Sequence, residues 1–239
     1  MAKNRKKQAA PAGFDNMKIF YGVLAIIAVV GIGSILYARS QSAGMATEPL
    51  DLSDVADGAT LIQRAQPVSL GAEDAPVQVL VFSDYMCPSC GTWAGQIEPR
   101  LKPEFVETGK VRLMYYDFPL GGSFQYSFVA ARAARCAGDQ DRYWEYHDRL
   151  FATQQTWSYS PNMPTSHFMQ IARDVGIDTS TFESCLRSDQ HAEVVSANRM
   201  LGEQLGVSGT PTIFLNGRQI REWSDYTAVR AAIQAAGGV

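Results

Sequence analysis

Two cysteines separated by two residues form the most reactive candidate site in this chain. Cys87 and Cys90 flank Pro88 and Ser89, and they follow the apolar run Val77–Phe82. A pair with this spacing, where a strand ends and a helix begins, is typical of thiol–disulfide exchange. We expect Cys87 to be the nucleophile, because unpaired N–H groups and the helix dipole stabilise a thiolate at a helix start. Cys90, one turn later, is expected to be the less exposed, resolving thiol.

A second motif lies far downstream. Thr210 and Pro211 precede the apolar run Thr212–Leu215, and the Asn-Gly pair after that run predicts a hairpin. Together the two motifs resemble the thioredoxin fold, in which a cis-proline loop faces the Cys-x-x-Cys. The resemblance implies a cis Thr210–Pro211 bond and a Thr210 backbone that pairs with an extended substrate. The alternative is a trans proline in an ordinary loop, because only about 5–6% of bonds before proline are cis.

The sequence between these motifs is helical in pattern, which is similar to the DsbA-like branch of the superfamily rather than to small thioredoxins. The phrase Phe82–Cys90, FSDYMCPSC, is also close to what DsbA-like proteins carry. The resemblance implies an α/β, thioredoxin-like fold in one domain over 67–239, with a helical insertion over about 122–205. The best-known strong oxidant of the family carries Pro-His between its cysteines. Ser89 cannot supply a cationic imidazole, so very strong oxidising power is not expected here.

Hydrophobic periodicity predicts the order strand, helix, strand, block of helices, hairpin and closing helix. The first helix extends from the cysteines to about Val106. Because Pro99 and Pro103 lie inside it, we expect a kink or break near Glu98. The predicted strands cover residues 77–82, 111–118, 212–215 and 218–221. The predicted helices after the first one cover residues 124–137, 142–154, 166–175, 181–187, 192–205 and 225–236.

The two remaining cysteines, Cys136 and Cys185, both lie in the predicted helical insertion. Outside the cytoplasm such a pair is expected to form a disulfide. A bridge closing a loop of about 50 residues stabilises a fold by roughly 3–4 kcal/mol in the chain-entropy model. A second redox relay and two unpaired thiols are the alternatives.

The N-terminal part of the chain has the pattern of a membrane anchor. Residues 1–18 form a basic tail, and residues 19–38 contain no charge. A helix of about 20 residues spans roughly 30 Å, the hydrocarbon thickness of a bilayer. We therefore expect a transmembrane helix at 19–38, a cytoplasmic tail, and a stalk at 39–66 that leads to an extracytoplasmic domain. A cleaved signal peptide is the alternative.

Composition excludes some classes of function. The chain has 239 residues and a net charge of −3, with no basic patch beyond the N-terminus, so nucleic acid is not an expected partner. A structural zinc site needs four ligands at recognisable spacing, and Cys136 and Cys185 do not supply a second Cys-x-x-Cys. We therefore expect neither a metal nor an organic cofactor, the redox group being the Cys87–Cys90 disulfide itself.

Other polar residues give weaker signals. Asp84 is a candidate for proton transfer to the buried thiol, although a helix cap is the simpler interpretation. Trp93 lies at core spacing in the first helix. The histidines and the arginines of the helical insertion are far from both motifs in sequence, and we expect them to be solvated or capping: His147, His167, His191, Arg135, Arg142 and Arg149.

The favoured function is that of an extracytoplasmic enzyme that donates its Cys87–Cys90 disulfide to unfolded or partly folded exported proteins. The resemblance implies a membrane reoxidant of the DsbB or vitamin K epoxide reductase type. A disulfide reductase or isomerase kept reduced by a membrane partner is the alternative within redox chemistry. A non-catalytic adaptor or chaperone using the same groove is the alternative outside it.

Overall fold

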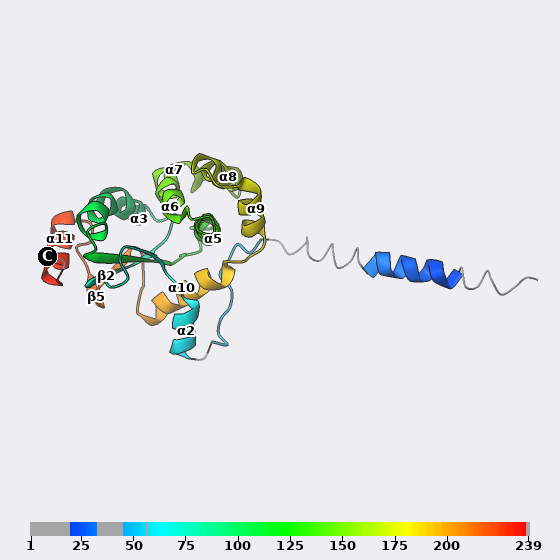
Figure 1. Ribbon diagram of the computed structural model, residues 1–239, viewed down its shortest axis with the longest axis horizontal. Coiled ribbons are helices and arrows are strands. Elements are labelled where there is room, and N and C mark those ends of the chain that lie inside the picture. Colours follow the sequence, from blue (N-terminus) through cyan, green and yellow to red (C-terminus); the bar gives the residue numbers. More distant parts are fainter. Residues whose placement is uncertain (1–19, 33–44, 56, 238–239) are drawn as a thin grey trace, which may run out of the picture. The chain divides into compact units, whose positions relative to one another are not determined.

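Five strands form the mixed sheet that carries the candidate site. The structure, a computed structural model, describes residues 20–32, 45–55 and 57–237 (Figure 1). The sheet has the order β1-β3-β2-β4-β5, in which β2 and β3 are parallel and the other pairs are antiparallel. The strands are β1 (Val68–Leu70), β2 (Val77–Ser83), β3 (Val111–Asp117), β4 (Thr212–Leu215) and β5 (Arg218–Ile220).

The central strand β2 leads directly to the cysteines. Val77, Val79 and Val81 are fully buried, as expected for a strand whose apolar residues face a covered side of the sheet. In the parallel register Ser83 lies opposite Asp117, so β2 and β3 end together. The chain that leaves β2 therefore enters the site at the carboxyl edge of the sheet.

The helix that follows the cysteines continues through both prolines. It consists of α3 (Pro88–Thr92), η1 (Trp93–Ile97), α4 (Glu98–Leu101) and η2 (Lys102–Val106). The chain therefore does not break near Glu98, although the helix type changes there from η1 to α4. The helix instead widens to π-helical turns at η1 and η2, and such turns absorb local disruption of the hydrogen-bond ladder.

Six helices separate β3 from β4, as the predicted helical insertion requires. In Figure 1, α5, α6, α7, α8 and α9 lie together beyond one end of the sheet, while α10 lies near α2. The closing helix α11 (Tyr226–Ala235) follows β5. The inserted helices are α5 (Ser127–Gly138), α6 (Tyr143–Ala152), α7 (Gln154–Trp157), α8 (Thr165–Asp174), α9 (Thr179–Arg187) and α10 (Ala192–Gln204).

Part of the predicted stalk belongs to the domain instead. The chain divides between Gly44 and Met45, and the segment that follows packs on the domain. Leu52 and Leu61 are buried in one cluster with residues of β2, β3 and α10, and Leu61 belongs to helix α2 (Gly58–Arg64). Buried Arg132 of α5 donates to the Ala46 carbonyl. The stalk prediction for 39–66 is therefore wrong from residue 45 onward, because these side chains bury apolar surface.

The described residues before the domain are helical at 20–32. The rest of the predicted 19–38 span, and the predicted tail at 1–18, lie outside the described residues. Within the described part of the chain, no helix combines the length and apolar character that crossing a membrane requires.

The predicted disulfide between Cys136 and Cys185 is present and connects α5 to α9. The two residues are 49 positions apart, and both are largely buried. The bridge ties together two helices of the insertion.

Replacing both bridge cysteines with alanine is expected to lower the free energy of unfolding by about 4 kcal/mol, because the unfolded chain regains the freedom of a loop of about 50 residues. Denaturant unfolding with the Cys87–Cys90 pair held in one redox state measures this loss. Thiol exchange at Cys87 should be unaltered at a temperature where the variant is folded. A variant as stable as the parent chain would contradict a structural role for the bridge.

Candidate active site

Cys87 lies at the N-terminus of α3, where the chain turns from extended to helical. Its backbone is extended, and Pro88 occupies the start of the helix, where a missing N–H leaves no hydrogen bond unmade. No side chain caps this helix end. The N–H groups of Ser89 and Cys90 are therefore directed at the Cys87 sulfur, and both lower its pKa.

The Cys87 thiol is strongly acidic in this setting. A hydrogen bond from the Cys90 thiol is the largest cause and, with the backbone N–H groups of Cys90 and Ser89, it outweighs burial and lowers the Cys87 pKa to about 5. Cys87 is thus a thiolate at neutral pH. A thiolate is the form that attacks a disulfide.

Cys90 has the opposite properties. It is fully buried, and burial, followed by its hydrogen bond to Cys87 and the charge on that sulfur, raises its pKa well above the ordinary value. The Asp84 N–H donates to Cys90 Sγ at 3.4 Å. The two cysteines therefore form an asymmetric pair of one thiolate that is 7% exposed and one protonated thiol that is fully buried.

The downstream motif meets the cysteines in space. The Thr210–Pro211 peptide bond is cis, as predicted. The Cys87 thiol donates to the Thr210 carbonyl at 3.3 Å, although the two residues are 123 positions apart. This carbonyl can accept a proton from a thiol but not from a thiolate, so it is free for another donor when Cys87 ionises.

Gln154 is a site residue that the sequence analysis did not find. Its Nε2 donates to the carbonyls of Tyr85 (2.7 Å) and Cys87 (2.9 Å), and its side chain is buried. A Cβ at Gly91 would lie 2.9 Å from Gln154 Oε1, so the glycine after Cys90 makes room for this amide. In the sequence, Gly91 is the residue from which a close neighbour of the cysteine helix could have been inferred.

Replacing Gln154 with methionine is expected to destabilise the protein by about 1–3 kcal/mol, since the side-chain volume is kept while the Tyr85 carbonyl loses the amide donor. The Cys87 carbonyl retains the Gly91 N–H as a donor. Denaturant unfolding gives the change, and ultraviolet thiolate titration shows whether the Cys87 pKa moves with it. Gln155→Met is the matched control, because Gln155 is exposed on the same short helix. Equal losses in the two variants would contradict this role.

Asp84 does not cap the helix, so the capping interpretation is wrong. It is buried, and its carboxylate accepts from the Met86 N–H (2.7 Å), the Ser127 hydroxyl (2.5 Å) and the Leu120 N–H (2.8 Å). Burial, despite these donors, raises its pKa to about 6, and the charge on Cys87 adds to the shift. Asp84 thus holds the loop before Cys87 against two later segments.

Two predicted surface residues are in fact buried near the site. His147 is fully buried on α6, where its Nδ1 lies 2.9 Å from the Tyr85 hydroxyl and its Nε2 lies 3.4 Å from Glu98 Oε2. Arg135 is buried against Asp117 at 2.5 Å. The expectation of solvated roles for both residues is therefore wrong. Trp93 is fully buried, in agreement with a core role.

Glu98 belongs to a group of side chains that could bind a metal ion, but a lysine already forms ion pairs within this group. Glu98, His147 and Asp148 bring their side-chain ligand atoms within 4.8 Å of one another. Lys102 Nζ lies 3.4 Å from Glu98 and 3.1 Å from Asp148, so one ammonium is already paired with both carboxylates. This arrangement does not fit a divalent cation. The other cluster contains Cys136 and Cys185, whose sulfurs are joined to each other.

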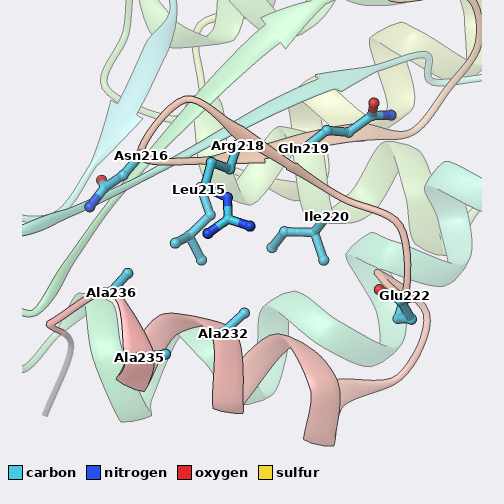
Figure 2. Close-up of a pocket in the computed structure, with 9 residues that line it drawn as sticks. All are labelled: Leu215, Asn216, Arg218, Gln219, Ile220, Glu222, Ala232, Ala235 and Ala236. Carbon is cyan, nitrogen blue, oxygen red and sulfur yellow. The ribbon is translucent and has the colours of Figure 1, made fainter.

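A separate pocket of about 460 Å³ lies between the β4–β5 hairpin and α11 (Figure 2). Arg218 and Ile220 from the hairpin face Ala232 of the helix across it. Neither the cysteine motif nor the Thr210–Pro211 loop contributes to its lining. The pocket is therefore separate from the thiol site.

Comparison with known proteins agrees with this geometry. The family model described as Thioredoxin matches residues 63–235. A probable disulfide bond formation protein D of Bacillus anthracis is 29% identical over 88% of this chain and 92% of its own length. The disulfide bond formation protein D of Bacillus subtilis is 28% identical over 72% of this chain and 77% of its own length.

Solved structures include the same group of proteins. The oxidised BdbD of Bacillus subtilis has a TM-score of 0.64 and 27% identity, covering 72% of this chain and 96% of its own. The region that the family model matches contains the sheet, the cysteine helix and the helical insertion. With its acidic Cys87, its buried Cys90 and the cis-proline loop beside them, the chain belongs to the thioredoxin family and is a DsbA-like thiol–disulfide oxidoreductase.

Proposed function

We propose that this protein oxidises exported proteins by donating the Cys87–Cys90 disulfide to them. The observation that carries the proposal is the asymmetry of the pair, with a Cys87 pKa of about 5 beside a buried Cys90. A thiolate stabilised in this way makes the reduced protein more stable and its disulfide more oxidising. The names of the Bacillus relatives, disulfide bond formation proteins, support the same direction.

The cycle uses the two sulfurs in fixed roles. A substrate thiolate attacks the Cys87 sulfur, the Cys87–Cys90 bond breaks, and Cys90 leaves as a thiolate that takes up a proton. A second thiolate of the same substrate then attacks the substrate sulfur of the mixed disulfide. The substrate disulfide forms, and Cys87 is released as a thiolate. The substrate loses two electrons and two protons. Cys90 takes up one of the protons and the other goes to the solvent, because Cys87 remains a thiolate at neutral pH.

Substrate recognition through main chain is part of the proposal. The Thr210 carbonyl lies 3.3 Å from the Cys87 sulfur and points at the reacting atom. An extended substrate whose cysteine meets Cys87 would bring a backbone N–H within reach of this carbonyl, in the manner of an added strand. Recognition of this kind depends little on the substrate's side chains, which suits a catalyst that acts on many unfolded chains.

The membrane setting is also proposed from the sequence. The uncharged segment 19–38 behind a basic tail supports a single-pass anchor with the catalytic domain outside the cytoplasm. An anchored domain is well placed for reoxidation by a membrane protein of the DsbB or vitamin K epoxide reductase type. Extraction of the full chain from membranes by detergent, and not by alkaline carbonate, would support the anchor. Release by carbonate would contradict it.

An equilibrium with glutathione tests the direction of catalysis. We expect a reduction potential well above thioredoxin's value of about −270 mV, and oxidation of a reduced, unfolded substrate by a stoichiometric amount of the oxidised protein. Cys87→Ser should abolish both reactions. A potential near that of thioredoxin would favour the reductase, and full function in Cys87→Ser would favour the adaptor.

A further inference from the structure

The Cys136–Cys185 bridge lies on the floor of a polar hollow. The hollow has a volume of about 590 Å³, and both cysteines contribute to its lining. The other residues that line it carry hydroxyl, amide or carboxylate groups, and none of them belongs to the thiol site. Cys185 is 9% exposed, whereas Cys136 is 2% exposed. A small thiol can therefore approach the bridge from this side, and the Cys185 sulfur is the one that it meets first.

An imidazole and a carboxylate lie beside the two sulfurs. His191, which precedes α10, has a ring nitrogen within 4.8 Å of both sulfur atoms. Asp139, which follows α5, has its Oδ2 atom 3.5 Å from Cys185 Sγ and 2.8 Å from His191 Nε2. A disulfide sulfur has no proton to donate, so its approach to the carboxylate is a contact and not a hydrogen bond. The ends of α5, α9 and α10 thus bring four possible metal ligands together.

These four groups are the ligand types of zinc sites. Cysteine sulfur, histidine nitrogen and carboxylate oxygen bind Zn²⁺ at about 2.0–2.3 Å in a tetrahedral arrangement. The ligand atoms of such a site are therefore roughly 3.3–3.8 Å apart. Asp139 Oδ2 lies 2.8 Å from the imidazole and 3.5 Å from the Cys185 sulfur, and the imidazole lies within 4.8 Å of both sulfurs. The cluster is thus close to the required dimensions before any side chain has moved.

The disulfide bond is what keeps a metal ion from this cluster. Zinc binds cysteine as the thiolate, and neither sulfur of a disulfide has that charge. Reduction by a dithiol supplies it. One thiolate of the dithiol attacks the Cys185 sulfur, the Cys136–Cys185 bond breaks, and Cys136 leaves as a thiolate that takes up a proton. The second dithiol sulfur then attacks the first, and Cys185 is released and protonated. The dithiol loses two electrons and two protons and becomes a disulfide.

We propose that reduction of the Cys136–Cys185 bridge converts this cluster into a zinc site, with Cys136, Cys185, His191 and Asp139 as its ligands. The two thiols release their protons to the solvent when the metal binds. The bridge and the zinc site exclude each other, because they use the same sulfurs. Zinc therefore holds α5 to α9 in the reduced protein, as the disulfide does in the oxidised protein.

The surroundings of the cluster suit a bound cation. Gln190 Nε2 donates to the same Asp139 oxygen at 3.1 Å, so a neutral amide orients the carboxylate. Such partners of a ligand raise the affinity of a metal site. Among the described residues, no lysine or arginine lines the hollow. The cluster around Glu98 differs in this respect, because Lys102 already lies between its carboxylates.

Zinc titration of the reduced chain tests the proposal. The full-length variant Cys87→Ser/Cys90→Ser lacks the other cysteine pair, which could also bind zinc. It is reduced with dithiothreitol while folded, separated from the reductant without oxygen, and titrated with zinc chloride against a chromogenic chelator. We expect one zinc ion per chain in the reduced protein and none in the oxidised protein. Cobalt in place of zinc should give a sulfur-to-cobalt charge-transfer band and the strong visible bands of a tetrahedral site.

Single substitutions in this background identify the ligands. His191→Ala and Asp139→Asn should each weaken zinc binding at least about tenfold, since even a residue that only orients a ligand contributes about 10–100-fold. His167→Ala and Asp141→Asn are the matched controls, because neither residue belongs to the cluster, and both should leave the affinity unchanged. Asp141 has a φ of 59°, a conformation that asparagine also adopts.

Stability gives a second readout that does not depend on the variants. The reduced protein should unfold at a higher denaturant concentration with zinc than with a chelator, and the oxidised protein should show no difference. Equal zinc binding by the oxidised and reduced proteins would mean adventitious surface binding and would overturn the proposal. A bridge that dithiothreitol does not reduce in the folded chain, or an affinity unchanged in both ligand variants, would overturn it too. None of these results bears on the redox function of Cys87, which the glutathione equilibrium tests separately.

Discussion

Cys87 in the reduced protein is expected to ionise with a midpoint near pH 5. Compared with an ordinary cysteine pKa of about 8.5, this shift stabilises the folded, reduced protein by roughly 3 kcal/mol at neutral pH. The pKa is lowered in the folded state, so the contribution is present when the thiolate exists and is lost as pH falls through about 5. The oxidised protein has no thiolate and therefore does not gain this stabilisation. The disulfide should therefore be a stronger oxidant by about 60 mV.

Ultraviolet thiolate absorbance and the pH dependence of alkylation both report this midpoint. Cys87→Ser should remove the transition and the redox activity together. Cys90→Ala should raise the midpoint, because the Cys90 thiol is the largest of the groups that favour the Cys87 anion. A midpoint at or above that of a free cysteine, or one unmoved by Cys90→Ala, would show that this electrostatic description of the pair is wrong.

Much of the fold was predictable because its signals are local. Buried strands, the Cys-Pro start of α3 and the Asn-Gly hairpin each occupy a few consecutive residues. Five of the observed helices of the insertion begin and end close to the predicted bounds, whereas α7 was not predicted. The Thr210–Pro211 loop meets Cys87 as the resemblance implied, because the order of the two motifs already specifies a sheet that brings them together.

The errors concern residues whose environment depends on distant partners. Arg135 lies on α5, whose residues 127–137 are all buried, and His147 lies on the buried face of α6. Their charged partners, Asp117 and Glu98, come from other elements. In hindsight, Tyr143, His147 and Phe151 share one face of α6 at helical spacing, and this pattern could have indicated a buried histidine. Residues 45–66 were misjudged for a similar reason, because Leu52 and Leu61 find their apolar partners on β2, β3 and α10.

The buried Arg135–Asp117 pair gives the largest expected loss of stability outside the thiol site. Arg135 Nε contacts Asp117 Oδ2 at 2.5 Å, and its Nη2 donates to the Gln66 carbonyl at 2.9 Å. Arg135→Met would leave the Asp117 carboxylate buried without its counter-charge. We expect the free energy of unfolding to fall by about 3–5 kcal/mol, the usual cost of breaking a buried pair from one side.

Denaturant unfolding of matched variants tests this interpretation. Arg149→Met breaks an exposed pair with Asp174 and should change stability by less than about 1 kcal/mol. In the double variant Asp117→Leu/Arg135→Met, much of the loss should be recovered, because no buried charge is left without a partner. A double variant as unstable as Arg135→Met would assign the cost to packing and to the Gln66 contact instead. Recovery would mean that the loss in Arg135→Met comes from the Asp117 charge left buried without a partner, and not from the absence of an attraction that holds α5 to β3.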